Sequence, residues 1–267
     1  MNESDSEKIA TLLEQKGYRP AQEKQADLVI INMCSVRQSA VDRVYYKISK
    51  LKSKILITGC VLEKDKKRFQ EMGARFKRFN LEKITPSYDG VTLPNGRVKP
   101  KTCFIPIMRG CNNFCSYCVV PYTRGREKFK PQKNIICEVE HLLKHGNKKI
   151  ILLGQNVNSY PGFVKLLQDI TKLKNNFKVS FLTNHPKDFS DALIHEIAKN
   201  KKISKEIHLP VQSGDNKILK AMNRKYTREQ YLKLVEKIKS KIPKANLTTD
   251  VIVGFPGETK KAFENTL

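Results

Sequence analysis

The pattern of apolar positions divides the first part of the chain into alternating helices and strands. Residues 27–32 and 54–58 are short, almost continuously apolar runs, which is typical of strands buried on both faces. Residues 6–16 and 41–51 carry apolar residues at helical spacing, so a predicted helix precedes each strand. The first part of the chain is therefore expected to form a parallel-sheet α/β domain.

The pattern breaks at residues 86–101, where Pro, Gly and Asn replace the periodic apolar positions. We place a domain boundary here. The expected amino-terminal domain covers residues 1–90, and the second domain covers residues 97–267.

After this break, strands and helices alternate to the end of the chain. The predicted strands are residues 104–108, 149–153, 178–182, 205–209 and 247–253. The predicted helices are residues 132–145, 163–173, 188–199, 215–222, 227–242 and one that starts at residue 258. Repeated βα units predict a barrel or partial barrel, whose chemistry lies on loops at the carboxyl ends of its strands. Five residues in the motifs below each follow a predicted strand: Cys111, Gly154, Asn184, Gln212 and Gly254.

Length and composition fit a folded chain with a charged partner. With 267 residues, 39% of them hydrophobic, the chain can bury a sizeable core. It lacks the roughly 18 consecutive apolar residues of a membrane span, and its first residues do not resemble a secretion signal, so we expect a cytoplasmic protein without a membrane partner. Its 51 Lys and Arg against 26 Asp and Glu give a formal charge of +25, which favours a polyanion such as nucleic acid. A Lys-rich solvated surface explains the same excess, so charge alone leaves RNA binding open.

The chain has seven cysteines, an odd number in a reducing compartment, so metal ligation or core packing is expected rather than a disulfide framework. Three of them, Cys111, Cys115 and Cys118, lie at spacings of four and three in the run Arg109-Gly-Cys-Asn-Asn-Phe-Cys-Ser-Tyr-Cys. A loop of this length can surround one 4Fe-4S cluster, with each thiolate on one iron and the fourth iron open for a chelating substrate. Zinc is the alternative, but it usually needs a fourth Cys or His nearby, and the next candidate is Cys137 on a predicted helix.

The spacing CxxxCxxC after the first strand of a βα series resembles the radical S-adenosylmethionine (SAM) superfamily. Further motifs narrow the resemblance to the tRNA methylthiotransferases that modify isopentenylated adenosine beside the anticodon. These motifs are Cys118-Val-Val-Pro-Tyr-Thr-Arg-Gly, Leu153-Gly-Gln-Asn-Val-Asn, His185-Pro-Lys, His208-Leu-Pro-Val-Gln-Ser-Gly and Asp250-Val-Ile-Val-Gly-Phe-Pro-Gly-Glu. The resemblance implies an enzyme that cleaves SAM at the cluster of Cys111, Cys115 and Cys118 and adds a methylthio group to carbon two of N6-isopentenyladenosine in tRNA. It also implies tRNA, an electron donor and a sulfur donor as partners.

The front of the chain resembles the amino-terminal domain of the same family through Asn32-Met-Cys34-Ser-Val-Arg and Thr58-Gly-Cys60. The resemblance implies that Cys34 and Cys60 are ligands of an auxiliary 4Fe-4S cluster. The family has a further strand and a third cysteine ahead of Met1, and Met33 replaces the usual Thr. Beyond residue 267 the family continues with the rest of the barrel and a small β-rich RNA-binding domain. We therefore expect a chain shortened at both ends, in which assembly of the auxiliary cluster and tight tRNA binding are open.

Polar residues at strand ends are the candidate ligands of SAM and of the substrate. Position at strand ends assigns to the cofactor Gln155, Asn156, Asn184, Gln212 and Asp250, although loop solvation or turn formation explains each one singly. Tyr117 is assigned to the cofactor because it lies between two cluster ligands. Tyr117 either flanks the adenine or shields the cluster. Arg124 and Arg126 either meet substrate phosphate or pair with a carboxylate within the barrel.

The remaining cysteines, Cys103 and Cys137, are expected in the hydrophobic core, because each lies among apolar neighbours. Two kinds of rival function remain. Sister enzymes thiolate threonylcarbamoyladenosine in tRNA or a ribosomal protein, and an inactive iron-sulfur or zinc fragment could bind RNA through its basic surface.

Overall fold

The computed structural model describes residues 1–81, 84 and 102–267, so the expected boundary at residues 86–101 lies outside the described residues. The chain divides into two compact units: unit 1 comprises Met1–Pro100 with Tyr122–Gly125, and unit 2 comprises Lys101–Pro121 with Arg126–Leu267. The short segment Tyr122–Gly125 therefore belongs to unit 1, although the sequence on both sides of it belongs to unit 2.

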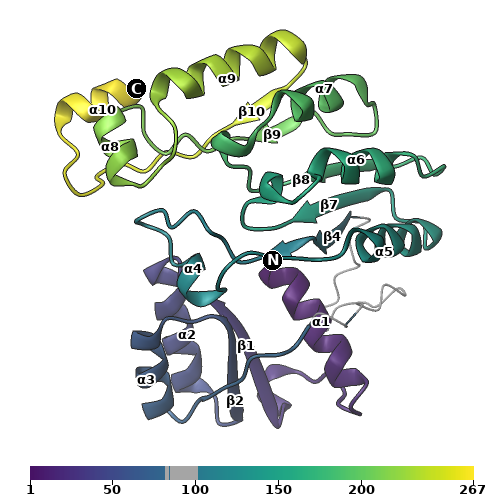
Figure 1. Ribbon diagram of the computed structural model, residues 1–267. Coiled ribbons are helices and arrows are strands. Elements are labelled where there is room, and N and C mark those ends of the chain that lie inside the picture. The colour runs from purple at the N-terminus through teal and green to yellow at the C-terminus, as the bar shows by residue number, and fades with distance from the viewer. Residues whose placement is uncertain (82–83, 85–101) are drawn as a thin grey trace. The chain divides into compact units, whose positions relative to one another are not determined.

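Unit 1 is built on a three-stranded parallel sheet in the order β1–β2–β3. Its strands are β1 (Leu28–Cys34), β2 (Lys54–Cys60) and β3 (Arg75–Phe76), and its helices are α1 (Asn2–Glu14), η1 (Glu23–Gln25), α2 (Gln38–Lys50) and α3 (Glu63–Glu71). Figure 1 shows α1 on one side of this sheet and α2 and α3 on the other. Side chains alternate along β1 accordingly: Met33 packs into the core with Tyr45 of α2 and Phe69 of α3, whereas Asn32 donates to the carbonyl oxygen of Asn2 in α1 at 2.7 Å.

Unit 2 contains the partial barrel that the sequence predicts. Strands β4 (Thr102–Pro106), β7 (Lys149–Leu153) and β8 (Lys178–Phe181) form a parallel sheet in the order β4–β7–β8, and β9 (Glu206–His208) pairs in parallel with β10 (Asn246–Thr248). A single parallel bridge, Val179 to Ile203, connects β8 to the segment before β9. A short antiparallel pair, β5 (Met108–Arg109) and β6 (Lys128–Phe129), brackets the cysteine-bearing segment. The parallel strands confirm the predicted α/β fold.

The helices of unit 2 follow the strands in the expected order. They are α5 (Gln132–Lys144), η2 (Val157–Ser159), α6 (Phe163–Thr171), η3 (Pro186–Asp188), α7 (Asp191–Lys199), α8 (Asn216–Ala221), α9 (Arg228–Lys241) and α10 (Lys260–Thr266). The short helix α4 (Val120–Thr123) begins in unit 2 and ends in unit 1. Fully buried residues such as Ile105, Leu152, Val139 and Leu166 form the core between the strands and the helices that cover them. Among the described helices, none is long and apolar enough to cross a membrane.

The predicted strand 247–253 is shorter in the structure. After β10 the ladder is interrupted, and pairing resumes only at an isolated parallel bridge between Gln212 and Val251. There Gln212 donates its backbone N–H to the carbonyl oxygen of Asp250, and Ile252 donates to Gln212, each at 2.9 Å. The apolar run that suggested a longer strand is largely exposed there, since Val251 and Val253 are exposed side chains. This part of the strand prediction was wrong, because an apolar run does not show where a ladder is interrupted.

Candidate metal centre and cofactor site

The cysteine loop, residues 111–118, lies between β5 and α4 and carries three thiols. Cys111 and Cys115 are buried and Cys118 is half-buried. The turn passes through a left-handed conformation at Phe114 (φ 49°), which costs free energy in a residue other than glycine. The side-chain amide of Asn223 offsets this cost, because it donates to the carbonyl oxygens of Asn113 and Phe114 at 3.2 and 2.8 Å. The loop is thus held by the segment that follows α8.

Arg224, the next residue of that segment, contacts the loop directly. Its guanidinium donates to Cys115 Sγ at 3.4 Å and to the Tyr117 hydroxyl at 3.3 Å. It also donates to the Tyr226 hydroxyl at 2.9 Å and to the carbonyl oxygen of Pro210 at 3.2 Å. Arg224 itself is buried. The sequence does not reveal this residue, because nothing in its local sequence distinguishes it from a surface arginine.

The donor set of the loop fits an iron-sulfur cluster better than a single metal ion. Burial raises the pKa of the Cys111 thiol, and the neighbouring charges of Glu127, Cys115 and Cys118 act in the same direction. The three thiols therefore lie within electrostatic reach of one another. In the described ranges, however, no three His, Cys, Asp or Glu side chains converge closely enough to bind one metal ion, as tetrahedral zinc requires. Thiolates that each bind a separate iron of a cluster are spaced more widely.

Polar atoms without partners gather at the carboxyl ends of β7 and β8. Asn156 donates to Asp188 Oδ2 at 2.7 Å, and Asn184 donates to the carbonyl oxygen of His208 at 2.9 Å. The amide oxygens of Asn156, Asn184 and Gln155 are buried and accept no hydrogen bond within the described chain. A buried polar atom without a partner costs about 1–3 kcal/mol, so these three acceptors are suited to a ligand that donates hydrogen bonds.

His185 adds a donor to this group. Burial, reinforced by the charges of Arg224 and Lys187, lowers the pKa of His185 to about 3, so the ring is neutral. Its Nδ1 accepts the backbone N–H of Lys187 at 3.3 Å, which leaves the proton on Nε2. That buried Nε2 has no acceptor among the described residues. The end of β8 thus offers both an acceptor and a donor.

The other candidate cofactor residues are placed differently. Tyr117 packs against Ile218, Met222 and Ala262, and its hydroxyl accepts from Arg224 at 3.3 Å. Gln212 is half-buried with a left-handed backbone (φ 70°) and bridges to Val251. Asp250 is 68% exposed and accepts from His208 Nε2 at 3.1 Å.

The strand-end pair, Cys34 and Cys60, lies in register at the carboxyl ends of β1 and β2. Arg124, from the segment Tyr122–Gly125 of unit 1, donates from Nε to Cys60 Sγ at 2.8 Å and forms an ion pair with Asp5 at 3.0 Å. A hydrogen bond from Cys34, assisted by the Arg124 charge against the opposing effect of burial, lowers the pKa of Cys60 to about 6. The structure thus gives Arg124 a carboxylate partner, but one in unit 1 rather than in the barrel.

The two cysteines expected in the hydrophobic core differ in burial. Cys103 is buried, as predicted, but Cys137 is exposed on α5, so its assignment to the core was wrong. The buried face of α5 carries Ile135, Val139 and Leu142, and position 137 points away from it. Arg126 is exposed and lies over the ring of Phe114 at 4.1 Å.

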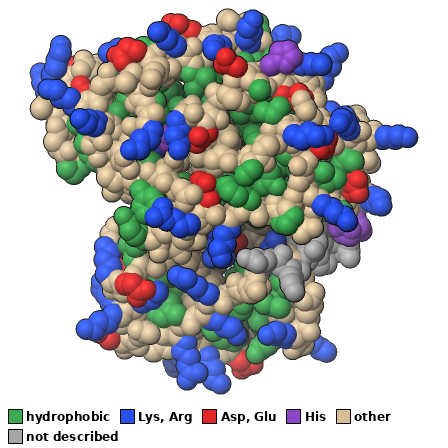
Figure 2. Space-filling view, in the orientation of Figure 1, with side chains coloured by type: hydrophobic (Ala, Val, Ile, Leu, Met, Phe, Trp, Pro, Cys, Tyr) green, Lys and Arg blue, Asp and Glu red, His purple; other side chains and the backbone are tan. Residues whose placement is uncertain are grey.

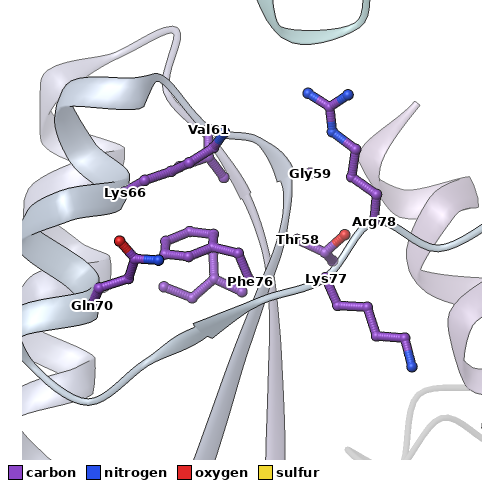
Figure 3. A pocket seen from close by; sticks show the side chains of 9 residues that line it. Thr58, Gly59, Val61, Lys66, Gln70, Phe76, Lys77 and Arg78 are labelled. Carbon is purple, nitrogen blue, oxygen red and sulfur yellow. The ribbon is translucent and has the colours of Figure 1, made fainter.

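Unit 1 also has a cavity of about 310 Å³ beside the end of β2 (Figure 3). Its lining includes Thr58, Phe76, Lys66, Lys77 and Arg78. The cations do not converge in it: Figure 3 shows Lys77 and Arg78 extending in different directions, and Lys66 forms an ion pair with Glu63. The cavity is therefore not a formed anion site.

Two family models match the chain. Residues 105–267 match the radical SAM superfamily, and residues 1–78 match a family described as Uncharacterized protein family UPF0004. The first match covers more than half of the chain and includes the cysteine loop and the strand ends described above. Fold and site together define a radical SAM protein.

Curated relatives narrow this class. The tRNA-2-methylthio-N(6)-dimethylallyladenosine synthase of Carboxydothermus hydrogenoformans is 44% identical over 308 residues, which cover 100% of this chain and 70% of the relative. The proteins of the same name from Thermotoga petrophila and Clostridium botulinum (strain Langeland) are 40% and 42% identical, again over 100% of this chain and 68% of each relative. The chain belongs to the tRNA-2-methylthio-N(6)-dimethylallyladenosine synthase family. The family resemblance found in the sequence is confirmed.

Solved structures agree on the fold. The cobalamin-dependent SAM radical enzyme OxsB superposes with a TM-score of 0.61 at 14% identity, over 97% of this chain and 44% of OxsB. The radical SAM methyltransferase TsrM from Kitasatospora setae gives a TM-score of 0.60 at 15% identity, over 97% of this chain and 62% of TsrM. This chain thus spans less than half of OxsB, and at these identities the likeness concerns the fold alone.

Proposed function

We propose that this chain is a radical SAM enzyme that adds a methylthio group to carbon two of N6-dimethylallyladenosine in tRNA. The observation that carries the proposal is the 40–44% identity, along the whole chain, to synthases named for this product. The cysteine loop supports it, because it offers three thiols of which two are buried. When bound there, a 4Fe-4S cluster supplies the electron that cleaves the sulfonium of SAM.

The chain's own residues bind and orient the reactants. Cys111, Cys115 and Cys118 hold the cluster. The free acceptors Gln155, Asn156 and Asn184 suit the donor groups of SAM, which are its ammonium and its ribose hydroxyls, and the Nε2 proton of His185 suits an acceptor. Tyr117, Gln212 and Asp250 complete the proposed cofactor set, with Tyr117 shielding the cluster from water. Arg126 is the better placed of the two substrate-binding candidates, because its guanidinium is exposed and Arg124 is already engaged.

Charge supports a tRNA partner only in a general way. The net charge of +25 favours phosphate contacts. Figure 2 shows Lys and Arg spread over the visible face rather than gathered in one patch. The charge thus adds affinity without locating the RNA, and the substrate assignment rests on the relatives. The reaction further requires an electron donor and a sulfur donor.

The auxiliary cluster requires more ligands than the strand ends of unit 1 supply. Cys34 and Cys60 supply two thiols, and in the described ranges no third metal-ligating side chain joins them. A cluster of four irons is normally held by more ligands than two. A second cluster on these residues therefore needs a ligand from elsewhere.

The test is anaerobic reconstitution with iron and sulfide, followed by assays of SAM cleavage and of tRNA modification. About four irons per chain with formation of 5′-deoxyadenosine supports the radical centre alone, and about eight supports both clusters. Mass spectrometry of nucleosides from tRNA carrying either dimethylallyladenosine or threonylcarbamoyladenosine then separates the two tRNA substrates. Zinc without labile sulfide, and no cleavage, would instead support a non-catalytic RNA-binding protein.

A further inference from the structure

Arg224 places a buried positive charge beside the cysteine loop, and no carboxylate of residues 1–81, 84 or 102–267 forms an ion pair with it. The residue is 9% exposed. Apart from Cys115 Sγ, its acceptors are neutral: the hydroxyls of Tyr117 and Tyr226 and the carbonyl oxygen of Pro210. None of the ion pairs found among the described residues includes it.

A buried cation in this state is costly. Removing a charged group from water costs several kcal/mol, and the interior keeps such a group only where an opposite charge and hydrogen bonds offset that cost. Arg224 donates hydrogen bonds, but in the part of the chain that the structure describes no carboxylate pairs with it. Of its contacts, Cys115 is the group that becomes an anion when it ligates a metal.

The surrounding structure fixes Arg224 in this position. Its backbone N–H donates to the carbonyl oxygen of Leu219 at 2.9 Å, which continues the end of α8. The Tyr226 hydroxyl, which accepts from Arg224, itself donates to the carbonyl oxygen of Val211 at 2.8 Å. The guanidinium is therefore preorganised at the thiol rather than drawn there by chance.

We propose that Arg224 is a positioning residue for the iron-sulfur cluster: it orients Cys115 and supplies the charge that offsets the negative cluster and its thiolates. The inference rests on the cluster in the proposed function and assigns a role that the cysteine motif does not contain. Reduction adds one electron, and so one negative charge, without breaking a bond. A fixed cation beside the thiolate favours that reduced state and raises the reduction potential of the cluster.

Two variants of Arg224 and one matched control test this role. Arg224→Gln removes the charge but keeps a polar side chain. Arg224→Lys keeps the charge but loses the planar fork that reaches several acceptors at once. Lys225→Gln removes the same charge from the adjacent, exposed position, where solvent and salt screen it.

The measurement is a reductive titration of the reconstituted chain followed by electron paramagnetic resonance, after iron and sulfide have been quantified. We expect Arg224→Gln to shift the potential to more negative values, so that the ratio of reduced to oxidised cluster falls at least about tenfold at a fixed solution potential, or about 59 mV. Arg224→Lys should shift it less, and Lys225→Gln should leave it unchanged. If the cluster of the Arg224→Gln variant has the same reduction potential as the cluster of the parent chain, the proposal is overturned.

A second readout applies if Arg224→Gln holds no cluster. In the cluster-free chain an uncompensated cation destabilises, so Arg224→Gln should then unfold at the same temperature as the parent or higher. Unfolding at a lower temperature would show an arginine that serves the fold alone, and would overturn the inference. A parent chain that binds neither iron nor sulfide refutes the cluster, and with it the anion that Arg224 is proposed to offset.

Discussion

The cysteine loop of unit 2 and the strand-end pair of unit 1 present their thiols in different ways. The loop carries its cysteines within one short turn, so local backbone sets their spacing. Cys34 and Cys60 lie on separate strands and meet only because β1 and β2 pair in register. In each unit a buried guanidinium donates to one thiol: Arg224 to Cys115 and Arg124 to Cys60.

The charges around the two guanidinium groups differ as well. Arg124 already has a carboxylate partner in Asp5, whereas the acceptors of Arg224 among the described residues are neutral apart from the thiol. The loop site is therefore short of one negative charge, and the strand-end site is not. This contrast indicates that the loop is built for a group more anionic than its own thiols.

The largest expected difference between the two sites should appear when one thiol is removed from each. We expect Cys115→Ala to abolish SAM cleavage, a greater loss than the roughly 10–100-fold caused by removing an outer partner of a metal ligand. Cys60→Ala should lower methylthiolation of tRNA but spare cleavage. The 5′-deoxyadenosine formed and the modified nucleoside are measured in the same reaction. Equal loss of cleavage in both variants would show that the two sites do not act separately.

Gly59 should be the most sensitive backbone position of the strand-end site. Its φ of 96° is left-handed, and an added Cβ would overlap the carbonyl oxygen of Met33. Gly73 is the matched control, because it is also left-handed (φ 82°) but has nothing within 4 Å of an added Cβ. Gly73→Ala should lower the free energy of unfolding by about 1–2 kcal/mol, and Gly59→Ala by more. Denaturant unfolding measures both, and equal losses would contradict the overlap at Gly59.

The next largest effect should be a pH dependence of stability that arises at the strand-end site. The pKa of Cys60 is lowered from 9.0 to about 6, first by the hydrogen bond from Cys34 and then by the Arg124 charge. Between these two pKa values the folded chain binds fewer protons than the unfolded chain, so the free energy of unfolding rises with pH across this range. The stability that the Cys60 thiolate contributes is lost as the pH falls through about 6. Arg124→Gln should reduce this slope. Denaturant titrations across the window test it, and an unchanged slope would exclude Arg124 as a cause.

Asp250 should give the smallest effect. Its carboxylate is 68% exposed and pairs with His208, so Asp250→Asn should change the free energy of unfolding by less than about 1 kcal/mol. Because Asp250 belongs to the proposed cofactor set, we expect Asp250→Asn to weaken the affinity for SAM, measured by calorimetry on the reconstituted chain, but by no more than about tenfold, since the carboxylate is exposed. An affinity equal to that of the parent chain would remove Asp250 from the cofactor set.

The sequence predicted those features that depend on neighbouring residues. The strand β7 has the bounds that its apolar run predicts, residues 149–153. The cysteine loop was also predictable, because the spacing of Cys111, Cys115 and Cys118 that defines it lies within one short segment. The parallel sheet of unit 1 followed from two apolar runs, each preceded by a helical pattern.

Features that depend on distant residues were not predictable. Arg224 lies 109 positions from Cys115, and Arg124 lies 64 positions from Cys60, so no local pattern joins them. The helix α3 was missed because it is mostly charged and its buried side chains are only Asp65 and Phe69. Cys137 was misplaced because apolar neighbours in sequence lie on both sides of a helix.

The segment Tyr122–Gly125 determines when unit 1 can be completed during translation. The last strand described in unit 1 ends at Phe76, yet Arg124 reaches its partners in unit 1 only after the ribosome has translated the cysteine loop. Until then Asp5 lacks its guanidinium partner and Cys60 its nearby positive charge. A fragment ending at residue 78, where the first family match ends, would fix that unfinished stage permanently. Amino-terminal domains are generally expected to fold first during synthesis, but here unit 1 stays unfinished until part of the downstream sequence has emerged.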